Sequence, residues 1–380
     1  MVKIFNLILT VCFIVWQSVA SAANSAQVDW NSAPRFTSKK DFANYLRECD
    51  KNLKTVIPVI FSGLNFTDEE LTGQDLFKIA PIWAGVFNVV KRDGQDIYAL
   101  GEITNTPGAR VAYAYQHGDT SFLTADEMQL YNAAVHIVNG ALQQPTALQQ
   151  ELFIHNKITN NVTFYAEGNV PFGARFSSAI GALLDGRANC QGYTDAFIML
   201  ARMCGFDVSR MEGQAGGSGH TWATIKFGNK SYFVDATWDD ASFTNSDLEY
   251  NNYIYFNVPA DIAKETHSWE PDIEPYNLQR TPDSAYFYKT NEYNTTHGKY
   301  FGIDAPNAEA ALREMARNAT VNGWRLSFAM CPYDERYIDA NFSNSHLLND
   351  ILPQEGWNVF MNITRRGKYM FYAIDATKSK

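Results

Sequence analysis

The chain has 380 residues, of which 46% are aliphatic or aromatic and only 19% are charged. A chain with that much apolar material can bury more than one core, which excludes an intrinsically disordered protein. At roughly 100–200 residues per domain, the length predicts two or three domains. The formal net charge of −10 argues against a nucleic-acid-binding protein, because such proteins usually carry a basic surface.

The first segment, residues 1–22, has the pattern of a cleavable signal peptide. Lys3 supplies a positive start, residues 4–16 form an apolar run, and Ala20-Ser21-Ala22 matches the small-x-small pattern that precedes a cleavage site. The run is shorter than the roughly 20 residues of a membrane-spanning helix, although a membrane anchor is the alternative interpretation. We expect cleavage after Ala22, a secreted or periplasmic protein, and no membrane span after signal removal.

Residues 23–140 are predicted to form an N-terminal accessory α/β region. Apolar periodicity and turn residues predict its main elements, which are a helix over 39–54, strands over 55–61, 84–90 and 97–103, and a turn at 92–94. Thr67 and Glu70 have the spacing of a capping box, which predicts a further helix start.

The boundaries of a central domain, residues 141–275, follow from turn and capping residues. Thr146 and Gln149 predict the start of a helix after Pro145, and a proline-rich linker over 271–282 ends the domain. Residues 276–380 are predicted to form a C-terminal accessory α/β region, with helices over 308–317 and near residue 347 and strands over 324–330, 357–364 and 368–374. Helix, strand, helix and hairpin follow one another on both flanks, which fits a diverged duplication or chance similarity.

One helix of the central domain is expected to carry a cysteine at its N-terminus. Its apolar positions fall on one face at helical spacing, namely Tyr193, Phe197, Leu200, Ala201 and Cys204. Gly205 is a natural helix stop. Cys190 therefore lies at or just before the first turn, where the partial positive charge of the helix stabilises a thiolate. A small buried residue is the alternative interpretation, and it fits Cys204 better.

His220 and Asp235 are predicted to lie on one face of a β-hairpin. Gly228-Asn229 can make a two-residue turn, so that Phe227 pairs with Lys230. In that register Asp235 is the diagonal neighbour of His220, close enough for an imidazole–carboxylate hydrogen bond. A three-residue turn would move Asp235 to the other face, and a surface ion pair is the alternative interpretation.

A thiol, an imidazole and a carboxylate in this arrangement form a candidate catalytic triad. A cysteine nucleophile needs a neighbouring base, and the base needs a group that fixes its tautomer. The residues Gly186–Tyr193, Gly219–Trp222 and Tyr232–Asp240 together resemble the core of the transglutaminase-like superfamily, secreted bacterial type, in order and in spacing. Tyr255–Val258 and His267 are similar to what often follows this core.

The resemblance implies an α+β fold, a papain-like transglutaminase core flanked by two smaller α/β regions. It implies Cys190 as nucleophile, His220 as general base and acid, and Asp235 as the residue that orients His220. The oxyanion would be met by the Cys190 N–H and by a second donor, for which Tyr165 is one candidate. Asn189 and Ala223 depart from the residues that many relatives carry at these positions.

The expected function is that of an exported thiol enzyme, a cysteine peptidase or amidase acting on a protein or peptide amide through a Cys190 acyl-enzyme. A transglutaminase that transfers the acyl group to an amine is one alternative, and a non-catalytic binding module is another. We expect no cofactor and no metal, because the other histidines lack ligand spacing and the chain has no EF-hand loop.

The remaining cysteines do not form a disulfide scaffold, because too few remain in so long a chain. A bridge between Cys49 and Cys331 is possible, and buried free thiols are the alternative.

Overall fold

The structure is a computed structural model that describes residues 28–72, 83–165, 175–240 and 255–280, together with several C-terminal strands. The predicted signal peptide, the helices expected over 308–317 and near residue 347, and Cys331 lie outside the described residues. In the described part of the chain, no helix has the length and apolar character that a membrane span requires.

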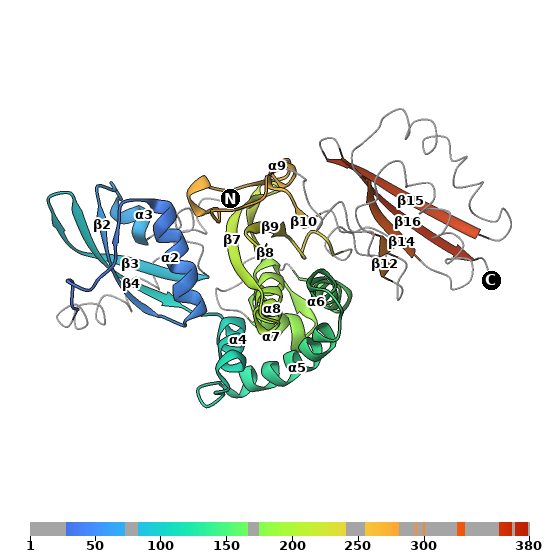
Figure 1. Cartoon of the computed structure of the whole chain (residues 1–380), viewed down its shortest axis with the longest axis horizontal. Helices are drawn as coiled ribbons and strands as arrows, with labels where there is room; N and C mark the ends of the chain where they lie inside the picture. The colour runs from blue at the N-terminus through green and yellow to red at the C-terminus, as the bar shows by residue number, and fades with distance from the viewer. Residues whose placement is uncertain are drawn as a thin grey trace, which may run out of the picture.

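The N-terminal sheet has the strand order β1-β2-β4-β3. Its strands are β1 (Arg35–Phe36), β2 (Val56–Ser62), β3 (Ala84–Asp93) and β4 (Asp96–Thr104). Helix α2 (Lys39–Lys51) covers one face, with Phe42, Leu46 and Cys49 packed against β2 and β4 in one apolar cluster (Figure 1). Cys49 is a free, buried thiol.

Local sequence signals explain most of this region. The predicted capping box is confirmed: the Glu70 N–H donates to Thr67 Oγ1, the Thr67 N–H donates to Glu70 Oε2, and α3 (Asp68–Thr72) follows. The turn predicted at 92–94 is displaced, because Asp93 pairs with Asp96 and only Gly94-Gln95 lie between the strands. Gly94 has a φ of 59°, the left-handed conformation that a tight turn requires there.

Five helices form the centre of the molecule. They are α4 (Pro107–His117), α5 (Ala125–Leu142), α6 (Ala147–Asn161), α7 (Ala179–Leu184) and α8 (Cys190–Met203). The capping box predicted at Thr146 and Gln149 is present at the start of α6. Helices α4 and α5 were not predicted, and they pack in the same apolar cluster as α6, α7 and α8. The boundary expected at residue 141 therefore falls inside a continuous core.

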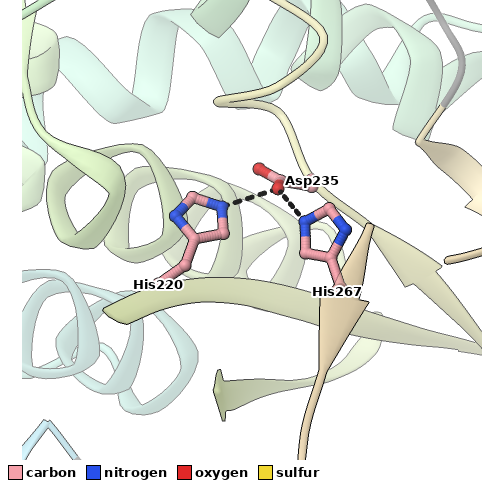
Figure 2. A group of neighbouring side chains, drawn as sticks. All are labelled: His220, Asp235 and His267. Atoms are coloured by element: carbon pink, nitrogen blue, oxygen red, sulfur yellow. Dashed lines mark hydrogen bonds and ion pairs between the residues drawn. The ribbon is translucent and has the colours of Figure 1, made fainter. Parts of the chain in front are cut away.

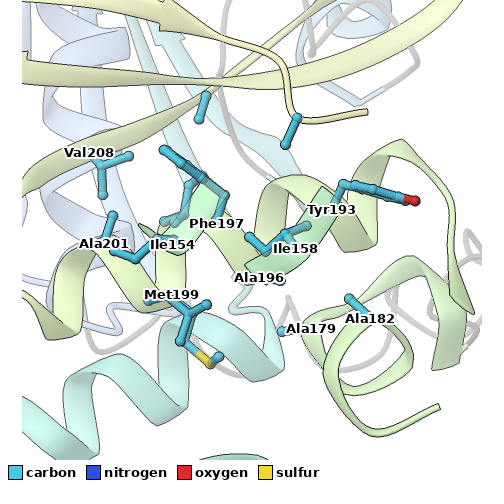
Figure 3. Packing of buried hydrophobic residues seen from close by; sticks show 14 of the residues in the cluster. Ile154, Ile158, Ala179, Ala182, Tyr193, Ala196, Phe197, Met199, Ala201 and Val208 are labelled. Carbon is cyan, nitrogen blue, oxygen red and sulfur yellow. The ribbon is translucent and has the colours of Figure 1, made fainter. Parts of the chain in front are cut away.

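Helix α8 is buried on every side, because all residues from Gly192 to Met203 are buried. Figure 3 shows Tyr193, Phe197 and Met199 of this helix in the core. A single apolar stripe was expected. The difference arises because the other helices cover α8 on one side while a sheet covers it on the other, as the shared cluster shows. A fully enclosed helix gives Cys190, at its first turn, a rigid support.

The central sheet is antiparallel and has the order β10-β9-β8-β7-β11. Its strands are β7 (Asp207–Ala215), β8 (Ser218–Phe227), β9 (Lys230–Val234), β10 (Phe256–Val258) and β11 (His267–Ser268). Phe227 pairs with Lys230, which confirms the predicted two-residue turn. Ser218 and Gly219, just before His220, already belong to β8, because Gly216-Gly217 form a tight turn from β7.

The smaller elements complete the described residues. They are β5 (Thr163–Phe164), η3 (Arg175–Ser177), β6 (Arg187–Ala188), α9 (Ala260–Ala263), η4 (Pro271–Ile273), β12 (Tyr293–Asn294), β13 (Lys299–Tyr300), β14 (Arg325–Met330), β15 (Trp357–Arg366) and β16 (Tyr369–Lys378). The last three strands follow the predicted ones within a few residues, and their order β14-β16-β15 matches β2-β4-β3 of the N-terminal sheet. A duplication would produce this match in strand order, and the duplication itself stays a prediction.

Candidate active site

Cys190 is the first residue of helix α8 and is partly exposed. Asn189 caps the helix: its side-chain oxygen accepts hydrogen bonds from the N–H groups of Gln191 and Gly192, at 3.1 and 3.3 Å. The Asn189 amide in turn donates to Ser177 Oγ at 2.8 Å. The departure of Asn189 from the family pattern thus has a local role, since asparagine is among the best N-cap residues. The thiol is held at the positive end of a helix dipole.

Packing explains why glycine stands two residues after the cysteine. A Cβ atom at Gly192 would lie 2.6 Å from the Phe176 carbonyl oxygen and 2.7 Å from the Cβ of Ala188. Both distances are well inside van der Waals contact, and one of the two atoms belongs to the backbone. Only glycine lets the first turn of α8 approach this wall, and so fixes where the thiol lies.

His220 and Asp235 form a buried hydrogen-bonded pair (Figure 2). The Nε2 atom of His220 lies 2.7 Å from Oδ2 of Asp235, and the two side chains are only 7% and 1% exposed. Because a carboxylate only accepts, Nε2 carries the proton of this bond. The other ring nitrogen, Nδ1, is left for the cysteine.

The Asp235 carboxylate accepts four hydrogen bonds. Oδ1 accepts from the backbone N–H groups of Thr237 and Trp238, at 3.0 and 3.2 Å. Oδ2 accepts from His220 and also from Nε2 of His267, at 3.0 Å. The buried charge is therefore satisfied on both oxygens, as a buried carboxylate must be.

These contacts shift both ionisations. Burial lowers the pKa of His220, but the Asp235 carboxylate and the nearby Cys190 thiol raise it by more, so that the resulting pKa is about 10. Burial raises the pKa of Asp235, but its contacts with His220 and His267 hold that pKa far below the usual range. The pair is therefore an imidazolium and a carboxylate at neutral pH.

The two acidic residues that follow the site anchor its loop to the helices. Asp239 Oδ2 lies 3.1 Å from Nε2 of His155 on α6, with both side chains fully buried. Asp240 accepts a hydrogen bond from the Tyr193 hydroxyl on α8. The segment that carries Asp235 is thus fastened to two helices, which limits its movement relative to Cys190.

Glu212, on β7 opposite Thr221, is a further acidic group at the site. Its side chain is 14% exposed and lies 3.4 Å from the Arg210 guanidinium. Burial raises the pKa of Glu212 by more than Arg210, Thr221 and His220 lower it. The resulting pKa is about 7. Glu212 was not predicted as a site residue, because only the β7–β8 pairing brings it near His220.

His220, Asp235 and His267 also offer donor atoms that metal ions accept, all within 4.8 Å of one another. The Oδ2 atom lies 2.7 and 3.0 Å from the two Nε2 atoms. Ligand atoms on a tetrahedral zinc ion are about 3.3 Å apart, as follows from zinc–nitrogen bonds of roughly 2.0–2.1 Å. The spacing is that of hydrogen-bonded partners.

The structure brings together all three residues of the candidate triad, and their catalytic roles stay predictions. The backbone N–H of Tyr165 donates to the Ala188 carbonyl at 2.8 Å, so this N–H is not an oxyanion donor. Ala223, the other departure from the family pattern, is packed in the core. No role was predicted for His267, because no hairpin register linked it to Asp235.

Comparisons with known proteins agree with the geometry. Residues 133–238 match the model of the transglutaminase-like superfamily core. No curated protein matches the chain.

Solved structures with similarity to the chain include a TGase, which is 14% identical with a TM-score of 0.27 over 54% of this chain and 59% of that one. A candidate cysteine protease from Cytophaga hutchinsonii is 14% identical, with a TM-score of 0.25 over 40% of this chain and 61% of that one. A candidate protease from Parabacteroides distasonis is 9% identical, with a TM-score of 0.26 over 77% of this chain and 56% of that one. The chain spans less than two thirds of the length of each.

The family match begins within α5 and ends at Trp238, so it contains Cys190, His220 and Asp235. Residues 133–238 of this chain are a transglutaminase-like superfamily domain with an α+β fold.

Proposed function

We propose that the protein is a thiol enzyme that transfers an acyl group from a peptide or protein amide through a Cys190 acyl-enzyme. The observation that carries the proposal is the buried His220–Asp235 pair beside a cysteine at a helix N-terminus. Cys190 is among the groups that raise the pKa of His220, which supports direct interaction of the two side chains.

In the proposed reaction the Cys190 thiolate attacks the carbonyl carbon of the amide. The His220 imidazolium gives its Nδ1 proton to the leaving nitrogen, and the C–N bond breaks to leave a thioester on Sγ. His220 then takes a proton from water, whose oxygen attacks the thioester, and the C–S bond breaks to release the acid and restore the Cys190 thiolate beside the imidazolium. Asp235 holds the ring in place throughout and stays ionised.

We favour water over an amine as the acceptor. The sequence pattern of residues 1–22 indicates export, and an exported enzyme works where water is abundant. N-terminal sequencing of the mature protein from the host tests the export step, with Ala23 as the expected first residue. A mature chain that still begins at Met1 would contradict it.

The first experiment measures the alkylation rate of the folded protein by iodoacetamide between pH 5 and 9. A fast phase at pH 5–6 that disappears in both Cys190→Ala and His220→Ala is the expected result, since an ion-paired thiolate reacts far below the free-cysteine pKa of about 8.5. Cys204→Ser is the matched control, because burial raises the pKa of Cys204 to about 11 at the other end of the same helix.

If every thiol reacts slowly until the pH nears 8.5, the thiol is not activated, and a non-catalytic binding module becomes the better description. With an activated thiol, two substrates separate the acceptors. Release of soluble fragments from labelled casein indicates hydrolysis, whereas incorporation of a fluorescent primary amine into casein indicates transamidation. Cys190→Ala is expected to abolish either activity, and full turnover by that variant would exclude the mechanism.

A further inference from the structure

One oxygen atom of Asp235 accepts hydrogen bonds from two imidazoles. Oδ2 lies 2.7 Å from Nε2 of His220 and 3.0 Å from Nε2 of His267, and Figure 2 shows both rings directed at it. We propose that His267 is a positioning residue for the thiol reaction. Its ring donates a second N–H to Asp235 and so limits how tightly the carboxylate holds His220. The role in catalysis rests on the proposed function, but the hydrogen-bond arrangement can be tested without it.

The contacts of His267 fix its tautomer. Its Nδ1 lies 2.9 Å from the Thr266 hydroxyl oxygen, which lies 2.8 Å from the Tyr255 hydroxyl. A lone pair on Nε2 would face the Asp235 carboxylate and repel it, so Nε2 must carry the proton. In the neutral ring Nδ1 accepts from the Thr266 hydroxyl, which lies nearer to Nδ1 than to its other acceptor, the Ala263 carbonyl at 3.4 Å, and the Thr266 oxygen accepts from Tyr255. Each hydrogen bond in this chain has one donor and one acceptor.

The backbone holds His267 in this position. His267 pairs with Ala215 and Ser268 pairs with Gln214, so β11 is fastened to the edge of β7. Gly213 makes this approach possible, because a Cβ atom there would overlap the Ser268 carbonyl oxygen and lie 2.7 Å from the Trp222 ring. Glycine at 213 thus lets the strand that carries His267 lie against the hairpin that carries His220.

Aromatic rings enclose the imidazole and exclude water from its hydrogen bond. The His267 side chain is 0% exposed. Four aromatic rings have centroids within about 5 Å of its own, those of Trp222, Phe233, Trp238 and Tyr255. A hydrogen bond in such dry surroundings is stronger than one in water, and its loss is correspondingly costly.

Sharing of Oδ2 has a consequence for proton transfer. Two donors on one oxygen divide its negative charge, so each is bound less strongly than it would be alone. The titratable groups that face His220 are Cys190 from α8, Glu212 from β7, Asp235 after β9 and His267 from β11. Without the His267 donor, Asp235 would stabilise the His220 imidazolium more strongly through Nε2, and the ring would give its Nδ1 proton less readily to a leaving nitrogen.

The test is nitrogen-15 NMR of histidine-labelled protein, in wild type, His267→Phe and His267→Gln. Wild type should show a His267 ring with a hydrogen-bonded proton on Nε2. His267→Phe keeps an aromatic ring but no donor, and should move the titration midpoint of His220 upward by about one pH unit, a tenfold rise in proton affinity. His267→Gln can place an amide N–H where Nε2 lies, and should restore most of the wild-type midpoint.

Two results would overturn the inference. One is a His267 ring with its proton on Nδ1 in wild type, a measurement that needs no variant to fold. The other is an unchanged His220 midpoint in folded His267→Phe, or equal shifts in the phenylalanine and glutamine variants. Iodoacetamide alkylation of the same samples separates this inference from the proposed function. Wild type with a fast Cys190 phase and an unmoved His220 midpoint in His267→Phe refutes only the role of His267.

Discussion

Nε2 of His220 and Oδ2 of Asp235 lie 2.7 Å apart in a site where neither side chain is more than 7% exposed. Replacement of one member of such a pair destabilises the fold, because the partner is left as an uncompensated charge in a poorly solvated place. Substitutions at either position are therefore expected to have large effects. Loss of the charge at Asp235 and loss of the ring at His220 should affect the Cys190 thiol through the same path.

Asp235→Asn is expected to slow the fast alkylation of Cys190 at pH 6 by about tenfold or more, since one pKa unit corresponds to a factor of ten. The amide can still accept from His220, but it no longer supplies the negative charge that raises the pKa of the imidazole. The imidazolium would then be present in a smaller fraction of molecules, and the thiolate with it. The rate is measured with iodoacetamide on the folded variant.

Asp207→Asn is the matched control for that experiment. Asp207 also pairs with basic groups, Lys51 at 2.6 Å and Lys226 at 3.6 Å, but its side chain is 49% exposed. Surface pairs of this kind contribute little, so the alkylation rate should equal that of wild type. Equal rates for Asp235→Asn and Asp207→Asn would exclude an electrostatic role for Asp235.

The folded protein should lose stability as the pH rises from about 6.5 toward 10. The pKa of His220 is raised in the folded state, to about 10, so the folded chain binds a proton that the unfolded chain releases above about 6.5. The stabilisation is complete below the unfolded pKa and disappears as the pH passes the folded one. Urea unfolding at pH 6.5, 8 and 10 measures it.

The doubly neutral variant His220→Gln/Asp235→Asn provides the comparison, because it retains polar groups at both positions but neither titrates. Its stability should change less than that of wild type between pH 6.5 and 10. Parallel curves for the two proteins over this range would mean that the pKa of His220 is not raised by folding.

Local sequence signals were sufficient to predict the chemistry-bearing elements. The glycine-asparagine turn at 228 and 229 fixed the hairpin register, and register alone placed Asp235 beside His220. The glycine stop and the apolar spacing placed Cys190 at a helix start. These features depend on neighbours close in sequence, and a single chain displays them directly.

Features that depend on tertiary packing were not predictable in this way. His267 is separated from Asp235 by 32 residues, and nothing in its own neighbourhood indicates that β11 pairs with β7. Helix α4, whose Val111 and Ala112 lie in the core, was not predicted although Thr106 caps its start and Gly118 ends it. The Gly216-Gly217 turn was a readable signal for the β7–β8 hairpin, which would have revealed Glu212 as a neighbour of the site.

Glu212→Gln should stabilise the protein at pH 8 and leave it little changed at pH 5. Burial raises the pKa of Glu212 to about 7 from an ordinary value of 4.5, so the folded state favours the protonated acid. Wild-type stability from this group is complete below 4.5 and is lost as the pH passes 7. The glutamine variant has no such loss, and thermal unfolding at pH 5 and pH 8 measures the difference.

Glu48→Gln is a suitable control for that comparison. Glu48 also pairs with a basic side chain, Lys51, but it is 61% exposed. Its substitution should have the same small effect at both pH values. A Glu212→Gln variant that behaves like Glu48→Gln would show that Glu212 ionises as an ordinary surface carboxylate.

Gly192→Ala should destabilise the protein by about 1–3 kcal/mol, the usual range for overpacking a close-packed interior. The added Cβ meets the Phe176 carbonyl oxygen and the Cβ of Ala188, at 2.6 and 2.7 Å, so relief requires a shift of backbone at the first turn of α8. Because that turn carries Cys190, the same substitution should slow alkylation of the thiol in the fraction that remains folded. Gly219→Ala, where a Cβ meets no atom within 4 Å, should leave the free energy of urea unfolding nearly unchanged. If both alanine variants unfold at the same urea concentration as wild type, the close approach at Gly192 does not constrain the cysteine.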